Sequence, residues 1–171
     1  MSSLHRPARS DDTYPTVAAR AEDLFEASTR LYDRARTLEA VVPRALYERG
    51  WRLAEGLAGD SPLCVLLHGD LTPANVLDGG PDRGLVAIDP APCLGDPAFD
   101  AVDLLLWRAD DPVSLDDRIA ALARAARLDA GRLRAWCVAF AGMTALELAD
   151  GRRGTPAQRQ TLLDLAAGAP G

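Results

Sequence analysis

The sequence predicts an α+β domain that is mostly helical, with short strands gathered near its middle. Apolar residues recur at a 3.6-residue spacing before residue 58 and after residue 99, as in amphipathic helices. Three brief, continuous apolar runs lie between these regions and are typical of small buried strands. A chain of 171 residues, 48% hydrophobic and 26% charged, can bury one core without a metal or disulfide.

The predicted elements follow the chain in order. Residues 1–17 are polar and contain Pro7 and Pro15, so we expect a mobile tail ahead of one domain over residues 18–171. Helices are predicted over residues 18–38, 43–57, 99–107, 114–128, 130–148 and 155–165, and strands over residues 63–67, 75–77 and 85–88. Ser114, Asp129 and Thr155 have the residue types and positions of helix N-caps.

The charge of the chain narrows the function classes. There are 25 acidic residues against 19 basic ones, a formal charge of -6, which argues against nucleic-acid binding through a broad basic field. All 19 basic residues are arginine. The absence of lysine excludes a P-loop, a Schiff-base enzyme and the nucleotide-anchoring strand lysine of kinases within this chain.

The cysteines and the amino terminus predict a cytoplasmic location. Cys64, Cys93 and Cys137 are odd in number and form no C-x-x-C pair, so we expect buried thiols in a reducing compartment, with neither a disulfide framework nor a zinc knuckle. No signal peptide or membrane span is predicted, because the amino terminus has no apolar stretch and the longest apolar segment, residues 135–149, contains Glu147.

The densest polar cluster is His-Gly-Asp-Leu-Thr-Pro-Ala-Asn over residues 68–75, which leaves one apolar strand and enters the next. Asp89 follows the third strand after the turn sequence DGGPDRG, so we expect a tight hairpin to bring it beside Asn75. The spacing H-x-D-x-x-x-x-N with a later strand-borne Asp is typical of kinases, where it supplies a catalytic base and two magnesium ligands. The chemistry needs a base within reach of a hydroxyl, together with hard oxygen ligands for Mg²⁺.

Residues 67–107, and in particular IDP followed by GDPAFD, resemble the carboxy-terminal lobe of the aminoglycoside phosphotransferase family of kinase-like enzymes, in its streptomycin and hydroxyurea branch. The resemblance implies that Asp70 is the catalytic base and that Asn75 and Asp89 bind magnesium. It implies that His68 braces the loop and that Asp100 holds the loop backbone. Thr72 stands where this branch often has His, and Ala74 where Gly is common.

The resemblance also implies an ATP- and Mg²⁺-dependent transfer of phosphate to a hydroxyl of a small antibiotic. No glycine-rich loop or strand lysine precedes His68, so we expect a carboxy-terminal lobe standing alone, with weak activity or none. The partners expected are the small-molecule substrate and either a separate amino-terminal lobe or a second copy of the chain, with neither nucleic acid nor membrane.

Two other functions remain open at this point. The first is a non-catalytic lobe kept as a binding module or as a gene fragment; the second is a metal-dependent hydrolase built on His68, with His5 as the chain's other histidine. Structural roles are predicted for several further residues: a helix cap for Asp96, a solvated or loop-bonded acid for Asp103, solvated acids for Asp110 and Asp111, and core packing for Trp107, Trp136 and Cys137.

Overall fold

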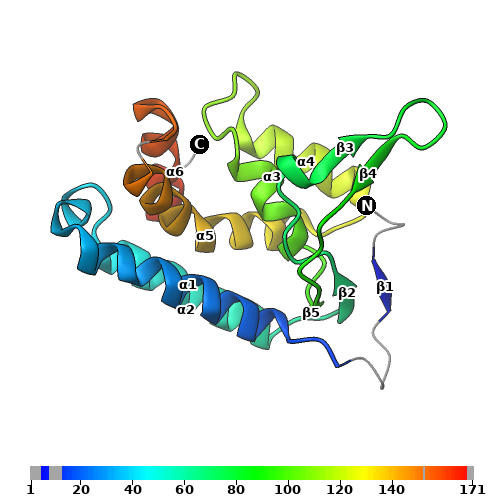
Figure 1. The fold of residues 1–171 in the computed structure, drawn as a ribbon, viewed down its shortest axis with the longest axis horizontal. Coiled ribbons are helices and arrows are strands. Elements are labelled where there is room, and N and C mark those ends of the chain that lie inside the picture. Colours follow the sequence, from blue (N-terminus) through cyan, green and yellow to red (C-terminus); the bar gives the residue numbers. More distant parts are fainter. Residues whose placement is uncertain (1–4, 8–12, 152, 169–171) are drawn as a thin grey trace.

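A computed structural model of the chain, which describes residues 5–7, 13–151 and 153–168, has the predicted α+β, mostly helical architecture (Figure 1). Six α-helices are described, together with three short 3-10 helices. The α-helices are α1 (Val17–Arg34), α2 (Arg44–Gly59), α3 (Val102–Leu106), α4 (Leu115–Ala126), α5 (Ala130–Asp150) and α6 (Pro156–Ala167). The 3-10 helices are η1 (Arg36–Ala40), η2 (Pro73–Asn75) and η3 (Phe99–Ala101).

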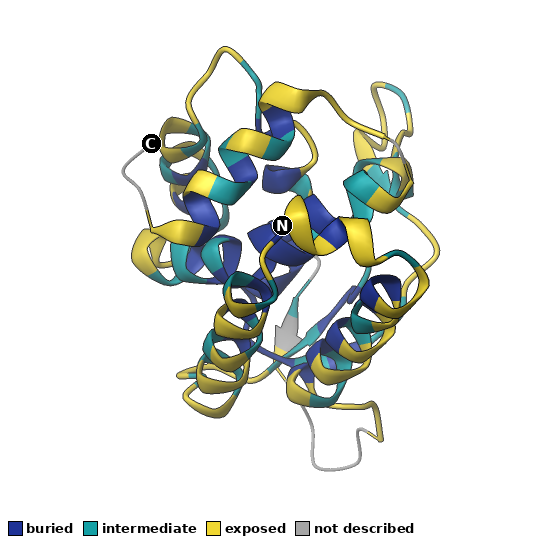
Figure 2. Ribbon diagram, turned by 90° about the vertical axis from the view of Figure 1, so that its left-hand side faces the viewer, coloured by how far each residue is buried: buried dark blue, intermediate teal, exposed yellow. Residues whose placement is uncertain are grey.

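Helix α5 is the centre of the core. It is apolar on most sides and packs against α2, α6, α4 and α1, as expected for a helix buried all round. Gly50 allows α2 to approach α5 closely, because a Cβ there would lie 2.3 Å from the Ala139 carbonyl oxygen. Figure 2 shows the buried faces of the helices turned inward and their exposed faces turned to solvent.

Among the described residues, five short strands lie beside this helical body. Strand β2 (Val65–Leu67) pairs antiparallel with β5 (Cys93–Gly95) on one side and with β1 (Arg6–Pro7) on the other. Strands β3 (Val76–Asp78) and β4 (Leu85–Ala87) form a separate antiparallel hairpin, in which Val76 faces Ala87. The predicted site residues therefore sit where β2 ends and where the hairpin begins and ends.

Part of residues 1–17 can be described, whereas the predicted mobile tail ahead of the domain stays a prediction. Arg6–Pro7 is a strand and His5 is bonded to the body, because the edge of β2 offers backbone groups that the segment can pair. Helix α1 begins at Val17 and ends at Arg34, after which η1 continues the predicted helix. Strands β1 and β5 were not predicted, since two or three residues give no readable alternation.

Other local predictions can be compared residue by residue. Ser114, Asp129 and Thr155 cap their helices as predicted, each accepting a hydrogen bond from the backbone N–H three residues later. Trp136 and Cys137 are buried as predicted. Two predictions were wrong: Trp107 is 56% exposed at the end of α3, and Cys64 is exposed just before β2. None of the helices described is sufficiently long and apolar to cross a bilayer.

Candidate active site

The polar loop, defined as residues 68–75, turns sharply out of β2 at Gly69. Its backbone has a φ of +77°, and a Cβ at this position would lie 1.9 Å from the Ala91 carbonyl oxygen. Only glycine fits both the left-handed conformation and the close approach. The Ala91 N–H donates to the His68 carbonyl at 2.9 Å, so the loop is fixed against the segment that follows Asp89.

Asp100 fixes the loop from below. Its Oδ2 accepts from the His68 N–H and its Oδ1 from the Gly69 N–H, both at 2.8 Å, and its side chain is fully buried. The His5 Nε2 also donates to Asp100 Oδ2 at 2.9 Å. A buried carboxylate with several charge-assisted donors is well satisfied, and it holds each donor in place.

His68 links the loop to the segment that carries Asp89. Its Nε2 lies 2.9 Å from the Ile88 carbonyl oxygen, and its Nδ1 lies 3.4 Å from the Asp70 N–H. Because the carbonyl can only accept, the proton belongs on Nε2 and Nδ1 is left as the acceptor for the longer contact. Neither ring nitrogen is therefore open to the solvent side as a proton carrier, and these contacts give His68 a bracing position.

Asn75 lies against Asp70. Its Nδ2 donates to the Asp70 carbonyl oxygen at 2.8 Å and to Asp70 Oδ2 at 3.1 Å. The two donors of the amide face Asp70, which leaves the amide oxygen as the remaining polar atom of Asn75. An amide oxygen is a neutral, hard ligand of the kind that Mg²⁺ accepts.

Asp89 follows directly on the residue that pairs with Asn75, since the Ile88 N–H donates to the Asn75 carbonyl at 2.9 Å. Asp89 is exposed and has a φ of 55°. Left-handed backbone is uncommon outside glycine and is concentrated at functional sites. The two residues predicted as oxygen donors, Asn75 and Asp89, therefore lie at the same end of the hairpin.

These donors suit a magnesium ion held together with a nucleotide. Mg²⁺ keeps several waters and is bound by one or two carboxylates plus substrate phosphates. Within the described ranges no three His, Cys, Asp or Glu side chains come together as a metal site of their own. Asn75 and Asp89 are the oxygen-bearing residues that the structure places at this end of the hairpin, since Ile88, the neighbour of Asp89, pairs with Asn75.

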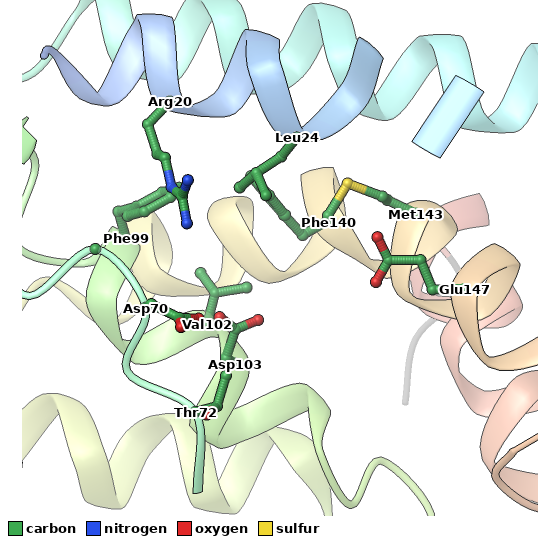
Figure 3. Close-up of a pocket in the computed structure, with 11 residues that line it drawn as sticks. Arg20, Leu24, Asp70, Thr72, Phe99, Val102, Asp103, Phe140, Met143 and Glu147 are labelled. Atoms are coloured by element: carbon green, nitrogen blue, oxygen red, sulfur yellow. The ribbon is translucent and has the colours of Figure 1, made fainter. Parts of the chain in front are cut away.

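A cavity of about 180 Å³ opens beside Asp70, between α1, α3, α5 and the polar loop (Figure 3). Its apolar wall is formed by Leu24, Phe99, Val102, Phe140 and Met143. Its polar groups are three acids, Asp70, Asp103 and Glu147, one cation, Arg20, and the hydroxyl of Thr72. A concave site with an apolar wall and a few convergent polar groups is the usual form of a small-molecule pocket.

The electrostatics of the cavity are dominated by its acids. Loss of water around the Asp103 carboxylate, together with repulsion from Asp70 and Glu147, raises the pKa of Asp103 to about 6. Arg20 acts in the opposite direction on the same group. The carboxylates outnumber the cation by three to one, so the cavity favours a positively charged ligand.

Sequence reasoning missed three polar residues of this region: His5, Arg20 and Glu147. No local pattern marks them, because each reaches the site from a segment far from residues 68–89. Asp96 does more than the predicted cap. Its Oδ1 accepts from the Ala98 N–H at 2.9 Å, while its Oδ2 binds Arg132 and accepts from the Trp136 Nε1–H at 2.7 Å.

The match to known families agrees with this geometry. The sequence profile described as aminoglycoside/hydroxyurea antibiotic resistance kinase matches residues 1–151. The chain belongs to this family. The resemblance predicted from residues 67–107 is thereby confirmed, and the match extends across α1, α3 and α5, which line the cavity beside Asp70.

One curated relative is a streptomycin 3''-kinase of Klebsiella pneumoniae. It is 35% identical over an alignment of 98 residues, and the match covers 52% of this chain and 36% of the relative. The matched part thus spans about a third of the relative's length. No solved structure matches the chain significantly.

Proposed function

We propose that this family member phosphorylates a hydroxyl group of a small antibiotic of the streptomycin or hydroxyurea type, with ATP as the phosphate donor. The observation that carries the proposal is the placement of Asp70, which is bonded to Asn75 and opens onto the cavity. In this arrangement Asp70 accepts the proton of the acceptor hydroxyl, and Asn75 with Asp89 holds magnesium on the nucleotide phosphates. His68 and Asp100 hold the loop in place and do not touch the substrate.

The charge of the cavity supports a cationic acceptor. Asp103 on α3 and Glu147 on α5 line the cavity together with Asp70, and an ammonium or guanidinium group would complement them. A substrate that carries such a group next to its hydroxyl would bring that hydroxyl to Asp70. The printed name of the relative, a streptomycin kinase, makes streptomycin the first acceptor to test.

The nucleotide contacts belong to a second unit in this proposal. We propose that the chain corresponds to the carboxy-terminal lobe of a kinase-like fold, completed by an amino-terminal lobe or by another chain. Leu77, Leu85 and Ile88 on the hairpin are 47%, 77% and 40% exposed. The register places Leu77 and Leu85 on opposite faces, so the hairpin presents exposed apolar side chains on both faces, which supports contact with another unit.

The test is phosphate transfer from Mg-ATP to streptomycin and to hydroxyurea, detected by the mass of the product. Asp70→Asn should lower the rate by about 10²–10⁴, because a positioned general base contributes on that scale. Asp82→Asn, an exposed acid in the hairpin turn, should leave the rate unchanged. A folded chain that neither transfers phosphate nor binds streptomycin would overturn the proposal in favour of a non-catalytic module.

A further inference from the structure

Arg20 is the charged residue of the cavity that the proposed reaction has not yet used. It lies on α1, three residues after the helix begins, and lines the same cavity as Gly69 and Asp70. Figure 3 shows its side chain reaching from α1 toward the wall that carries Asp70, Val102 and Asp103. Its position is therefore on the acceptor side of the proposed catalytic base.

Among the residues that the structure describes, the Arg20 side chain has no hydrogen-bond or ion-pair partner, although its charge acts on Asp103. Its Nε is buried and makes no hydrogen bond, and no ion pair or hydrogen bond is formed by the rest of its guanidinium group. Two other arginines differ: Arg132 binds Asp96 and the Leu57 carbonyl, and Arg118, whose Nε is also unpaired, donates from its two terminal nitrogens to carbonyls near the end of α3. A half-buried guanidinium with no hydrogen-bond partner has its donors available for a ligand.

The chemistry of the cavity indicates where an anion would fit. Asp103 and Glu147 make the rest of the wall negative, so an acceptor with its own negative group is disfavoured there. In the proposed reaction, the anionic group that comes next to Asp70 is the phosphoryl group during its transfer to the acceptor hydroxyl. A guanidinium presents several N–H donors in a plane and matches two phosphate oxygens at once. In a chain without lysine, arginine is the residue type left for this role.

We propose that Arg20 is a further catalytic residue, which binds the oxygens of the phosphoryl group while it is transferred. This inference rests on the proposed phosphotransferase function. The acceptor oxygen bonds to the γ-phosphorus, and its proton passes to the Asp70 carboxylate. The bond from the γ-phosphorus to the bridging oxygen breaks, and its electron pair leaves with ADP. Arg20 stabilises the charge on the non-bridging oxygens throughout, as arginines do in other phosphoryl transfers.

The first experiment measures binding and does not require turnover. The side-chain Nε–H signal of Arg20 is followed by NMR while inorganic phosphate is added in the presence of Mg²⁺. We expect a saturable shift of this signal and of the Gly69 and Asp70 amide signals. Arg20→Gln should abolish the amide shifts. Arg30→Gln, which removes an exposed arginine from the same helix, should preserve them.

Two results of the titration would overturn the inference. One is amide shifts that persist in Arg20→Gln, since phosphate would then bind without this residue. The other is an equal response of the Arg20 signal to acetate, which would assign the residue to a carboxylate of the acceptor. Arg20→Lys keeps a charge with fewer, non-planar donors, so we expect it to retain weaker phosphate binding.

The second experiment uses the transfer reaction. Arg20→Gln should lower kcat by about 10²–10³, the cost of losing one donor to transition-state charge, with KM for ATP little changed. Failure of the two proposals can be told apart. An Arg20 signal that responds to phosphate in a chain without antibiotic phosphorylation would overturn the proposed function and the catalytic role of Arg20, and would leave only its phosphate binding. Phosphorylation of streptomycin at an unchanged rate by Arg20→Gln would overturn the inference about Arg20 only.

Discussion

The helical body and the polar loop are held together by different forces. In the body, Phe25 is fully buried and contacts the rings of Tyr47, Trp51 and Phe140 at centroid distances of 5.1–5.7 Å. In the loop, backbone groups converge by hydrogen bonds on the single carboxylate of Asp100. Apolar burial is shared among many residues, whereas the loop depends on a few directed contacts. Changes in the body should therefore affect global stability, and changes in the loop should affect local geometry.

The largest expected effect comes from the aromatic cluster of the body. Phe25→Ala should lower the free energy of unfolding by about 3–5 kcal/mol, because it removes a buried ring and leaves a cavity. Urea denaturation measures this loss. Glu26→Ala, the exposed neighbour on α1, should change stability by less than about 0.5 kcal/mol. A loss for Phe25→Ala as small as that of the control would remove the distinction between the two regions.

A smaller and more local effect is expected at Asp100. Asp100→Asn removes the charge and one acceptor, so buried donors on His68, Gly69 or His5 lose a partner. The cost should be about 1–3 kcal/mol. Hydrogen exchange should accelerate at the amides of the polar loop before it does so in α5. Uniform acceleration throughout the body would show instead that Asp100 is part of the global fold.

Asp116→Asn is the matched control for that variant. Asp116 forms a surface ion pair with Arg134 at 3.0 Å, and both side chains are partly exposed to solvent. Exposed pairs contribute about 0–1 kcal/mol. The comparison therefore separates the loss of a buried, multiply bonded carboxylate from the loss of a negative charge alone.

Asp89 provides a sharper contrast between stability and function. Its φ of 55° is less strained in glycine, so Asp89→Gly should leave stability unchanged or raise it by up to about 1 kcal/mol. The same change should abolish binding of Mg²⁺ with nucleotide, measured with Mn²⁺ as a paramagnetic substitute. Asp82→Gly, in the exposed hairpin turn, should preserve that binding. A variant that is less stable and still binds the ion would give Asp89 a structural role.

The two regions also differed in what the sequence could predict. The helices of the body were predicted because burial imposes a 3.6-residue period, and the caps Ser114, Asp129 and Thr155 have local signatures. In the loop, the turn sequence predicted that Asp89 returns beside Asn75, and the structure pairs Ile88, the residue before Asp89, with Asn75. Arg20 and Glu147 were out of reach, because only the packing of α1 and α5 brings them to Asp70.

The smallest effect is expected at Asp103, because its side chain is exposed and solvent weakens its interactions with the other cavity acids. The pKa of this group is raised from 3.8 to about 6, so the folded chain binds its proton more tightly than the unfolded chain. Its contribution to stability is therefore fully present below pH 4 and is lost as the pH rises to about 6. Asp103→Asn should not show this loss of stability. The free energy of unfolding of the variant minus that of the parent chain should therefore increase from pH 4 to pH 6 and be constant above pH 6. Urea denaturation across that range measures the difference, with Asp23→Asn on the exposed face of α1 as the control. Parallel pH profiles for the parent chain and Asp103→Asn would contradict this prediction. They would mean that water in the open cavity screens Asp103 from Asp70 and Glu147, so that its pKa is not raised.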